Sequence, residues 1–294
     1  MFLLLNIFNA PIASLADSLV VRMSVHSHVN YGGMRLWGSL TFAIFSALFG
    51  LVWQQTGFGS MFLVGGILMF LVVGSALLLD ENAHVHDPSQ SQERSPALKP
   101  SASMLQDVPF LFILAAFFLI GAAFAIVWTF DSLFVAQLGG SNALIGGMRG
   151  LSALAELPPM QYSSRILRRL GDFKTLLLSL LLLALSDFGY WMAGPTWSIL
   201  LVNIFKGLGY GLFFIAMIVI VDRRAPHGLS ATYQGLTSAV AFGLAPTLVG
   251  PLGGWIYASI SPRAVFLTAG LLILAAMLIL IPAFIKRPMP VHSS

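Results

Sequence analysis

Residues 176–185 read LLLSLLLLAL, and this run decides the class of fold. The run lacks the two-residue alternation of apolar and polar side chains that a strand of a membrane β-barrel shows. An uninterrupted apolar run predicts instead an α-helix that crosses a bilayer, which takes about 20 apolar residues. Composition agrees, because 57% of the chain is hydrophobic and only 9% is charged. We therefore predict an all-α polytopic membrane protein.

Similar runs recur along the chain and predict about nine transmembrane helices. The predicted spans are residues 1–23, 35–55, 60–80, 108–136, 143–165, 173–193, 196–222, 229–256 and 262–285. Several are longer than an upright crossing needs, so we expect tilted or kinked helices.

A polar segment rich in Ser and Pro divides the first three predicted spans from the last six. Such a composition predicts a flexible linker, here on the cytoplasmic side. The predicted parts are a partial helical bundle (1–80), the linker (81–107), a six-helix bundle (108–286) and a cytoplasmic tail (287–294).

Lysine and arginine fall mainly in alternate loops. Of the 15 basic residues, 12 fall on the same side of the predicted membrane. They are Arg22, Arg35, Arg94, Lys99, Arg165, Arg168, Arg169, Lys174, Arg223, Arg224, Lys286 and Arg287. Basic loops stay on the cytoplasmic side, so we predict a cytoplasmic C-terminus and a multi-pass protein of the bacterial inner membrane. The net charge of +4 is then explained by loops that face anionic lipid, and a nucleic-acid partner is not expected.

The chain begins with MFLLL and lacks the basic residues that open a signal peptide. The charge pattern places this uncharged start outside the cell and gives an odd number of helices. We therefore expect that helices preceding Met1 are missing from this chain.

Several kinds of chemistry are excluded by residues that the sequence lacks. Zero cysteines exclude disulfides, thiolate metal sites and cysteine nucleophiles. No GxxxxGK[ST], HExxH or GxSxG motif occurs. His84 and His86 would give only two ligands on a flexible tract, which makes a poor metal site. We expect no enzyme activity, no cofactor and no metal.

Glycines spaced four residues apart predict helix faces that approach other helices closely. The pairs are Gly146 with Gly150, Gly207 with Gly211, and Gly250 with Gly254. The alternative is chance, because 28 glycines in an apolar sequence produce such spacings easily.

Ionisable side chains within the apolar spans are the candidates for function, since a charge at the bilayer centre costs about 2.5–3.5 kcal/mol on insertion scales. They are Asp17, Asp131, Arg149, Glu156, Asp187 and Lys206. Arg149 and Glu156 lie two helical turns apart and share one helix face. Burial favours a neutral Glu156 and a nearby cation favours its anion, so protonation can be reversible, as a proton-coupled carrier requires. The alternative is a structural ion pair.

The remaining charges leave alternatives open. Lys206 could be the counter-ion of Glu156 or Asp131, or it could bind an anionic group of a substrate. Asp131 and Asp187 lie nearer the outer ends of their helices, so a solvated rim and a pathway role are both open. Asp17 lies close to the cytoplasmic face, where we expect it to pair with Arg35 in a structural or gating role.

Three segments together resemble the major facilitator superfamily, in its branch near sugar/proton, nucleoside and phenylpropionate symporters. Residues 30–38, NYGGMRLWG, are similar to the segment that opens the fifth helix of that branch. Residues 164–174, SRILRRLGDFK, are similar to its basic loop between helices eight and nine. ATYQG (231–235) and GGWIY (253–257) are similar to features of its eleventh helix.

The resemblance runs over essentially the whole chain and implies helices four to twelve of a fold with two six-helix halves. It implies that Arg35 pairs with a fourth-helix carboxylate, here Asp17. It also implies that Glu156 matches an eighth-helix glutamate of substrate and proton coupling. The basic loop departs from the pattern because no aspartate precedes its arginines, and the tenth helix has Lys206 and Asp222 without a His/Glu relay.

We therefore expect a secondary active transporter of a small organic solute that works by alternating access and proton symport. Glu156 would be the titrating group, with Arg149, Lys206 and Arg35 as charge partners and Asp131 in the same pathway. The expected partners are the small-molecule substrate, protons and the lipid bilayer. The sequence does not determine the oligomeric state, and we expect a monomer. A competing interpretation is a non-transporting membrane protein with a partner-binding or regulatory role.

Overall fold

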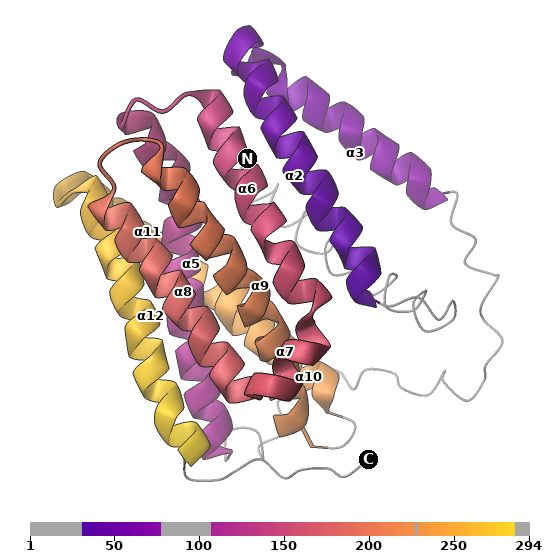
Figure 1. Ribbon diagram of the computed structural model, residues 1–294, viewed down its shortest axis with the longest axis vertical. Coiled ribbons are helices and arrows are strands. Elements are labelled where there is room, and N and C mark those ends of the chain that lie inside the picture. The colour runs from indigo at the N-terminus through magenta and orange to yellow at the C-terminus, as the bar shows by residue number, and fades with distance from the viewer. Residues whose placement is uncertain (1–30, 78–106, 227–228, 286–294) are drawn as a thin grey trace.

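A computed structural model describes residues 31–77, 107–226 and 229–285, and every regular element within these ranges is a helix (Figure 1). The elements are α2 (Tyr31–Thr56), the 3-10 turn η1 (Phe58–Ser60), α3 (Met61–Leu77), α5 (Val108–Gln137), α6 (Asn142–Gln161), α7 (Ser163–Leu170), α8 (Asp172–Met192), α9 (Ser198–Arg224), α10 (Ser230–Ser238), the π-helical η3 (Ala239–Leu244), α11 (Ala245–Ser259) and α12 (Pro262–Ile285). The predicted span 1–23 lies outside the described residues, as do nearly all of the predicted linker and tail.

Within the described residues, six helices are long and apolar enough to cross a membrane. These stretches are Trp37–Thr56, Val108–Gln137, Asp172–Met192, Ser198–Arg224, Thr232–Ser259 and Pro262–Ile281. The predicted span 229–256 is one rod, because α10, η3 and α11 follow each other without a break. α6 is less apolar than these helices because it carries Arg149, Glu156 and several small residues.

One sequence prediction was wrong at the end of α6. The predicted span 143–165 is divided, since α6 ends at Gln161 and the separate short helix α7 follows Tyr162. Arg165, Arg168 and Arg169, expected in a loop, lie on α7. The physical reason is the 3.6-residue period of this segment, in which Ile166 and Leu167 are partly buried and the arginines are exposed.

The hydrophobic core is built around α5, which packs against α12, α11 and η3. Phe110, Phe117 and Ile120 on α5 are fully buried. Phe213 of α9 and Phe266 of α12 complete this core, with ring centroids 5.5 Å from Phe117 and 5.0 Å from Phe134 respectively. Neighbouring helices thus bury one continuous apolar interior, while many side chains on the outer faces stay exposed.

Two of the three glycine pairs lie at close helix contacts, as predicted. A Cβ atom added to Gly146 would lie 2.4 Å from the Ser46 carbonyl oxygen on α2. A Cβ atom added to Gly207 would lie 2.1 Å from the Ser152 carbonyl oxygen on α6. α6 is therefore held between α2 and α9 at backbone-to-backbone distance, an arrangement that only residues without a side chain permit.

The third glycine pair does not behave as predicted. No atom lies within 4 Å of a Cβ atom added to Gly250, and the nearest to one added to Gly254 is a Phe130 ring atom at 3.9 Å. The close contact of this region lies elsewhere, where a Cβ atom on Gly121 of α5 would reach within 2.0 Å of the Ala241 carbonyl oxygen in η3. Spacing alone could not find this contact, because Gly121 has no partner glycine four residues away.

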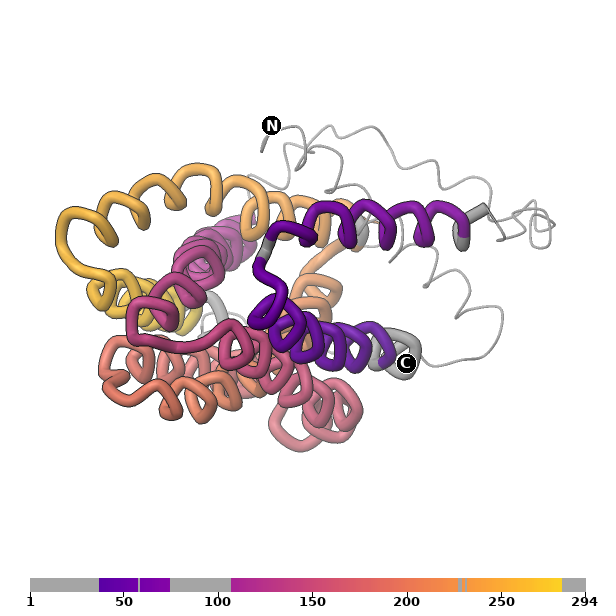
Figure 2. Tube along the Cα trace, turned by 90° about the horizontal axis from the view of Figure 1, so that it is seen from above, coloured from indigo at the N-terminus to yellow at the C-terminus, as the bar shows by residue number. Residues whose placement is uncertain are grey.

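α2 and α3 are attached to the rest of the described structure in different ways. α2 lies along α6, whereas α3 diverges from α2 after the η1 turn (Figures 1 and 2). Large apolar side chains on α3 are exposed, including Phe62 and Phe70. In a bilayer such side chains face lipid or other protein without cost, because acyl chains are equally apolar.

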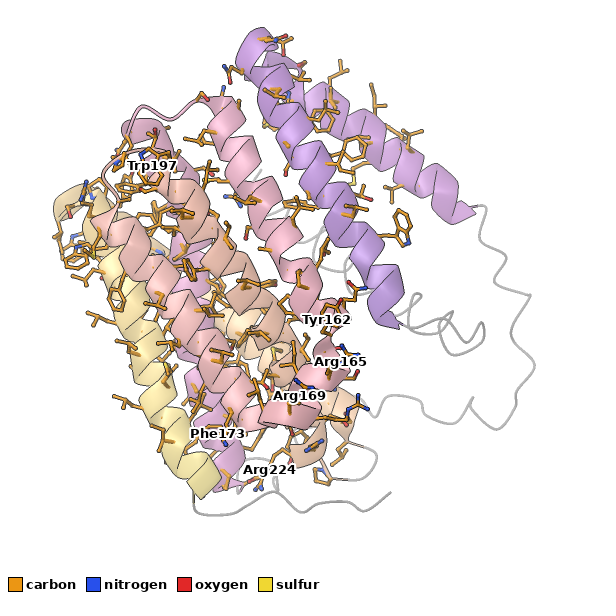
Figure 3. All side chains as sticks on the ribbon, in the orientation of Figure 1. Tyr162, Arg165, Arg169, Phe173, Trp197 and Arg224 are labelled. Carbon is orange, nitrogen blue, oxygen red and sulfur yellow. The ribbon has the colours of Figure 1, made fainter. Side chains whose placement is uncertain are left out.

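Basic side chains gather at one end of the bundle (Figure 3). Arg165, Arg169 and Arg224 lie at this end, and Trp197 lies at the opposite end. Arg224 donates hydrogen bonds to both carboxylate oxygens of Asp107, which also caps the first turn of α5. Arg223 binds Asp172 at 2.6 Å, which ties the end of α9 to the start of α8. The gathering of basic side chains at one end of the bundle agrees with the rule that basic segments stay on the cytoplasmic side of the membrane.

The α6–α9 contact gives a first prediction. Gly207→Ala should lower the thermal stability of the detergent-solubilised protein, because the added methyl group would collide with the Ser152 backbone and the Ala155 side chain. Overpacking of this kind costs about 1–3 kcal/mol. The matched control is Gly250→Ala, where the space is open, and it should leave the melting temperature unchanged or slightly raised. Equal melting temperatures for the two variants would contradict the packing described here.

Candidate functional site

A cavity of about 300 Å³ lies between α2, α5, α6, α8 and α9. Its polar lining consists of Arg149, Ser152, Glu156, Asp187, Asn203 and Lys206. Its apolar and aromatic lining consists of Phe42, Phe124, Val127, Trp128, Ala153, Leu183 and Tyr210. Charged groups from three helices thus meet beside aromatic rings in the middle of apolar segments.

Asp131 of α5 is the charge centre behind one wall of this cavity. The residue is fully buried, and its two carboxylate oxygens bind different cations. Arg149 Nη2 of α6 lies 2.6 Å from Oδ1, and Lys206 Nζ of α9 lies 2.8 Å from Oδ2. One carboxylate therefore connects three helices and balances two positive charges, a geometry that compensates the cost of burying it.

Hydrogen bonds fix the Arg149 side chain at this position. Arg149 Nη2 also donates to the Ser132 hydroxyl at 3.0 Å and to the Trp128 carbonyl at 3.4 Å. The Ser132 hydroxyl in turn donates to Asp131 at 3.1 Å. The Arg149 side chain is 35% exposed, so it remains in reach of a solute in the cavity while it holds Asp131.

Arg149 and Glu156 both line the cavity, as their shared helix face predicted. Their helix is positioned by the glycine contacts on both of its sides. The Glu156 backbone packs directly on Gly211 of α9, where an added Cβ atom would lie 2.9 Å from the Glu156 carbonyl oxygen. Glu156 itself is partly buried.

Lys206 of α9 binds one of the two carboxylates that the sequence offered as its counter-ion. Its ammonium group lies 2.8 Å from Asp131 Oδ2. The same ammonium lies 5.8 Å from the centroid of the Tyr190 ring. Tyr190 is fixed by Asn203, whose amide nitrogen donates to the Tyr190 hydroxyl at 2.8 Å and to the Ile199 carbonyl at 2.8 Å.

The solvated-rim alternative for Asp131 and Asp187 was wrong. Asp131 is 0% exposed and Asp187 is 4% exposed. The reason is tertiary packing of α8 against α9 and α12 and of α5 against α11 and α12, which covers the parts of these helices that sequence position alone placed near an outer end. Asp187 joins the cavity lining, in keeping with the pathway role that was the other open interpretation.

Sequence reasoning missed Asn203 of the cavity lining and left the role of Asp187 open. A signal existed in α8, where Leu176, Leu180 and Leu183 are followed by Asp187 and Tyr190 at spacings of three and four on one buried face. Leucines on all sides of this helix hide that face in the sequence.

The predicted Asp17–Arg35 pair cannot be placed. Asp17 lies outside the described residues, and only the backbone of Arg35 is described, within α2. Their pairing stays a prediction.

Aromatic rings form a packed cluster along the cavity wall. Trp128 stacks on Phe124 with ring centroids 5.3 Å apart, and the Tyr210 ring lies edge-on to both. Trp128 also stacks parallel to Phe242 of η3 at 6.5 Å. Because these rings hold one another, the cavity has a preformed aromatic wall beside its charged groups.

A second hollow of about 660 Å³ lies between α2, α5 and α6 and is mainly apolar. Phe45, Phe49 and Trp53 of α2 line it, together with Leu133 and Ile145. Arg149 and Phe42 line both hollows. Arg149 therefore stands between the charged cavity and an apolar one.

Apolar helices thus enclose a cavity lined by charged side chains. Residues 1–268 also match the MFS_1 like family. The chain belongs to this family. Members of the MFS_1 like family are transporters, so the expectations of superfamily membership and of no enzyme activity are both confirmed.

Three relatives show the same relationship. A maltose permease of Geobacillus stearothermophilus is 27% identical over 285 residues, which cover 95% of this chain and 69% of the relative. An uncharacterized transporter of Bacillus subtilis is 26% identical over 276 residues, covering 91% and 66%. A protein named "Probable 3-phenylpropionic acid transporter" of Escherichia coli is 27% identical over 298 residues, covering 98% and 73%. The chain spans about two thirds of the length of these family members.

Asp131→Asn should destabilise the protein strongly, because it leaves Arg149 and Lys206 together without their shared anion. Removing one partner of a buried ion pair costs about 3–5 kcal/mol. The double variant Asp131→Asn/Lys206→Met removes one of the two cations that have lost the Asp131 anion and should be more stable than Asp131→Asn alone. Unfolding of the purified protein in detergent measures both effects.

Asp222→Asn is the control for this comparison, since Asp222 is exposed at the end of α9 and should tolerate the change. A double variant no more stable than Asp131→Asn would show that Lys206 and Asp131 do not depend on each other.

Proposed function

We propose that this protein is a secondary active transporter that moves a small organic solute together with protons by alternating access. The cavity supports this proposal, because it combines charged, hydrogen-bonding and aromatic side chains in the interior of membrane helices. Ionisable groups at such positions are functional by default, since their burial is costly. Substrate sites of secondary transporters built from two related helical halves lie near the membrane midplane, between helices.

We assign proton binding to Glu156. Its carboxyl group lines the cavity on the same helix as Arg149, two turns away, and it is partly buried. A solute or cation that approaches Arg149 therefore changes the electrostatic surroundings of Glu156. Coupling then follows, because protonation of Glu156 and occupation of the cavity depend on each other.

Arg149 and Lys206 are the proposed solute-binding cations, with Asp131 as their resident anion. Arg149 is the more accessible of the two, with 35% of its side chain exposed against 11% for Lys206. Trp128 and Tyr210 offer flat rings on which a sugar or aromatic ring can lie. The two kinds of solute in the relatives' names, a sugar and an aromatic acid, define the first compounds to test.

The orientation and organisation expected from the sequence remain part of this proposal. They comprise an inner-membrane location with a cytoplasmic C-terminus, a partial N-terminal bundle (1–80), a linker (81–107) and a C-terminal six-helix bundle (108–286). The basic end of the bundle, with Arg165, Arg169 and Arg224, supports the cytoplasmic placement of that end (Figure 3). Asp17 and Arg35 are proposed as a gating pair on the same side.

Uptake into proteoliposomes tests the function directly. Maltose and 3-phenylpropionate are supplied to the purified chain with and without an inward proton gradient, and proton-driven accumulation of either compound is the expected result. Glu156→Gln should abolish accumulation while it preserves exchange of solute across the membrane, because the variant still binds solute and cannot release a proton. Glu93→Gln, the same substitution in the predicted linker, should behave as the unchanged protein. Accumulation that persists undiminished in Glu156→Gln would remove this residue from coupling.

Arg149→Lys tests the solute-binding role. Lysine keeps the charge and cannot reproduce the three hydrogen bonds that Arg149 Nη2 makes to Asp131, Ser132 and Trp128. We expect KM for the transported solute to rise by about tenfold, which corresponds to about 1.4 kcal/mol, the scale of one hydrogen bond to a charged group. Arg263→Lys at the outer end of α12 is the matched control and should leave KM unchanged.

A further inference from the structure

Asp187 is a buried carboxyl group that the proposed function has not yet used. It lies on the buried face of α8, is 4% exposed, and lines the same cavity as Glu156 and Lys206. Its hydrogen-bond partner in the described residues is the neighbouring Ser186, whose hydroxyl donates to Asp187 Oδ1 at 3.5 Å. This single long contact compensates little of the cost of a buried negative charge.

The cations of the cavity are bound to another carboxylate. Arg149 and Lys206 both bind Asp131, and in the part of the chain that the structure describes Asp187 takes part in none of the observed ion pairs. Lys206 nevertheless lies close enough to Asp187 to interact with it electrostatically. The Lys206 ammonium thus binds Asp131 and lies within electrostatic range of Asp187 as well.

The other groups around Asp187 do not replace this cation. Tyr190, on the same helix, is within electrostatic range of Asp187 and Asp131, but a phenol carries no positive charge, and its hydroxyl accepts a hydrogen bond from Asn203. Glu156 and Arg149 face the cavity from α6.

The helices that pack against the other sides of α8 add no charge beside Asp187. On α12 the one ionisable residue, Arg263, donates to the Trp191 and Ala193 carbonyls at the end of the helix. On α7 the ionisable residues Arg165, Arg168 and Arg169 lie near the opposite end of α8.

We propose that Asp187 is a second proton-binding residue of the cavity and that Lys206 is a counter-ion shared between Asp131 and Asp187. While Lys206 binds Asp131, Asp187 is a neutral carboxylic acid. When Lys206 moves to Asp187, the Asp187 O–H bond breaks, the proton passes to water in the cavity, and the new carboxylate pairs with the ammonium. Lys206 stays charged throughout, so the step exchanges one ion pair for another and releases one proton.

This exchange of ion pairs adds a second proton-binding residue to the proposed transporter. Its consequence for transport rests on the proposed function. Departure of Lys206 leaves Asp131 with Arg149 alone, which weakens the link between α9 and α5. Proton release at Asp187 would thereby change how tightly three cavity helices are held together. The number of protons that bind can be measured without transport, so the two proposals can fail separately.

Infrared difference spectroscopy on the purified full chain tests the proposal. The carbonyl stretch of a protonated carboxylic acid should be present at pH 7 and should be lost in Asp187→Asn. Asp131→Asn should also abolish the Asp187 band at pH 7, because the freed Lys206 then pairs with Asp187 as an anion. Asp131→Asn/Lys206→Met should restore the band, since the double variant has no ammonium to stabilise the Asp187 carboxylate.

Two further variants separate the outcomes. Glu156→Gln should retain the Asp187 band, whether or not it loses proton-driven uptake, so failure of the Glu156 role and failure of the Asp187 role give different results. Ser186→Ala controls for the loss of the adjacent hydroxyl and should keep the band. Absence of a band that depends on Asp187 in the unchanged protein, or a band that survives in Asp131→Asn, would overturn the shared counter-ion. An unfolding transition measured on the purified Asp131→Asn variant confirms that this variant is folded.

Discussion

The buried carboxylate of Asp131 is the constraint on which the cavity depends. A lone anion at 0% exposure in a membrane helix would be very costly, and here it is bound at 2.6 Å and 2.8 Å by Arg149 and Lys206. Each cation comes from a different helix, so electrostatic compensation also fixes how α5, α6 and α9 stand relative to one another. Two cations and one resident anion leave positive charge at the wall of the cavity, where a polar solute can approach it.

Glycine makes this electrostatic arrangement possible. Lys206 and Gly207 are neighbours, and the absence of a side chain at Gly207 lets α9 touch the backbone of α6 at Ser152. Gly146 does the same for α6 and α2 on the opposite side. The close approach of the backbones keeps the charged side chains within reach of one another. Arg149 and Lys206 can both bind Asp131 only if the helices that carry them are nearly in contact. Packing and charge are thus parts of one construction.

Several elements of this construction could be predicted from sequence. Apolar runs such as residues 176–185 predicted membrane helices, and Arg149 with Glu156 was assigned to one face because seven residues span two helical turns. The division of residues 143–165 into α6 and α7 was not predicted. The overall hydrophobicity of this segment hides the change from the membrane helix α6 to the amphipathic helix α7. Gly250 and Gly254 were over-interpreted for a related reason: spacing identifies a smooth helix face and does not say whether another helix covers it.

The sequence by itself determined the all-helical membrane class, the family resemblance and the set of intramembrane charges, because each of these depends on composition, period or motif along one chain. Tertiary structure alone decided which charges meet: Lys206 binds Asp131, and Asp187 lies inside the cavity and not at its rim. Pairing is a property of the distance between helices. That distance is set by contacts between residues far apart in sequence, as 75 residues separate Lys206 from its carboxylate partner.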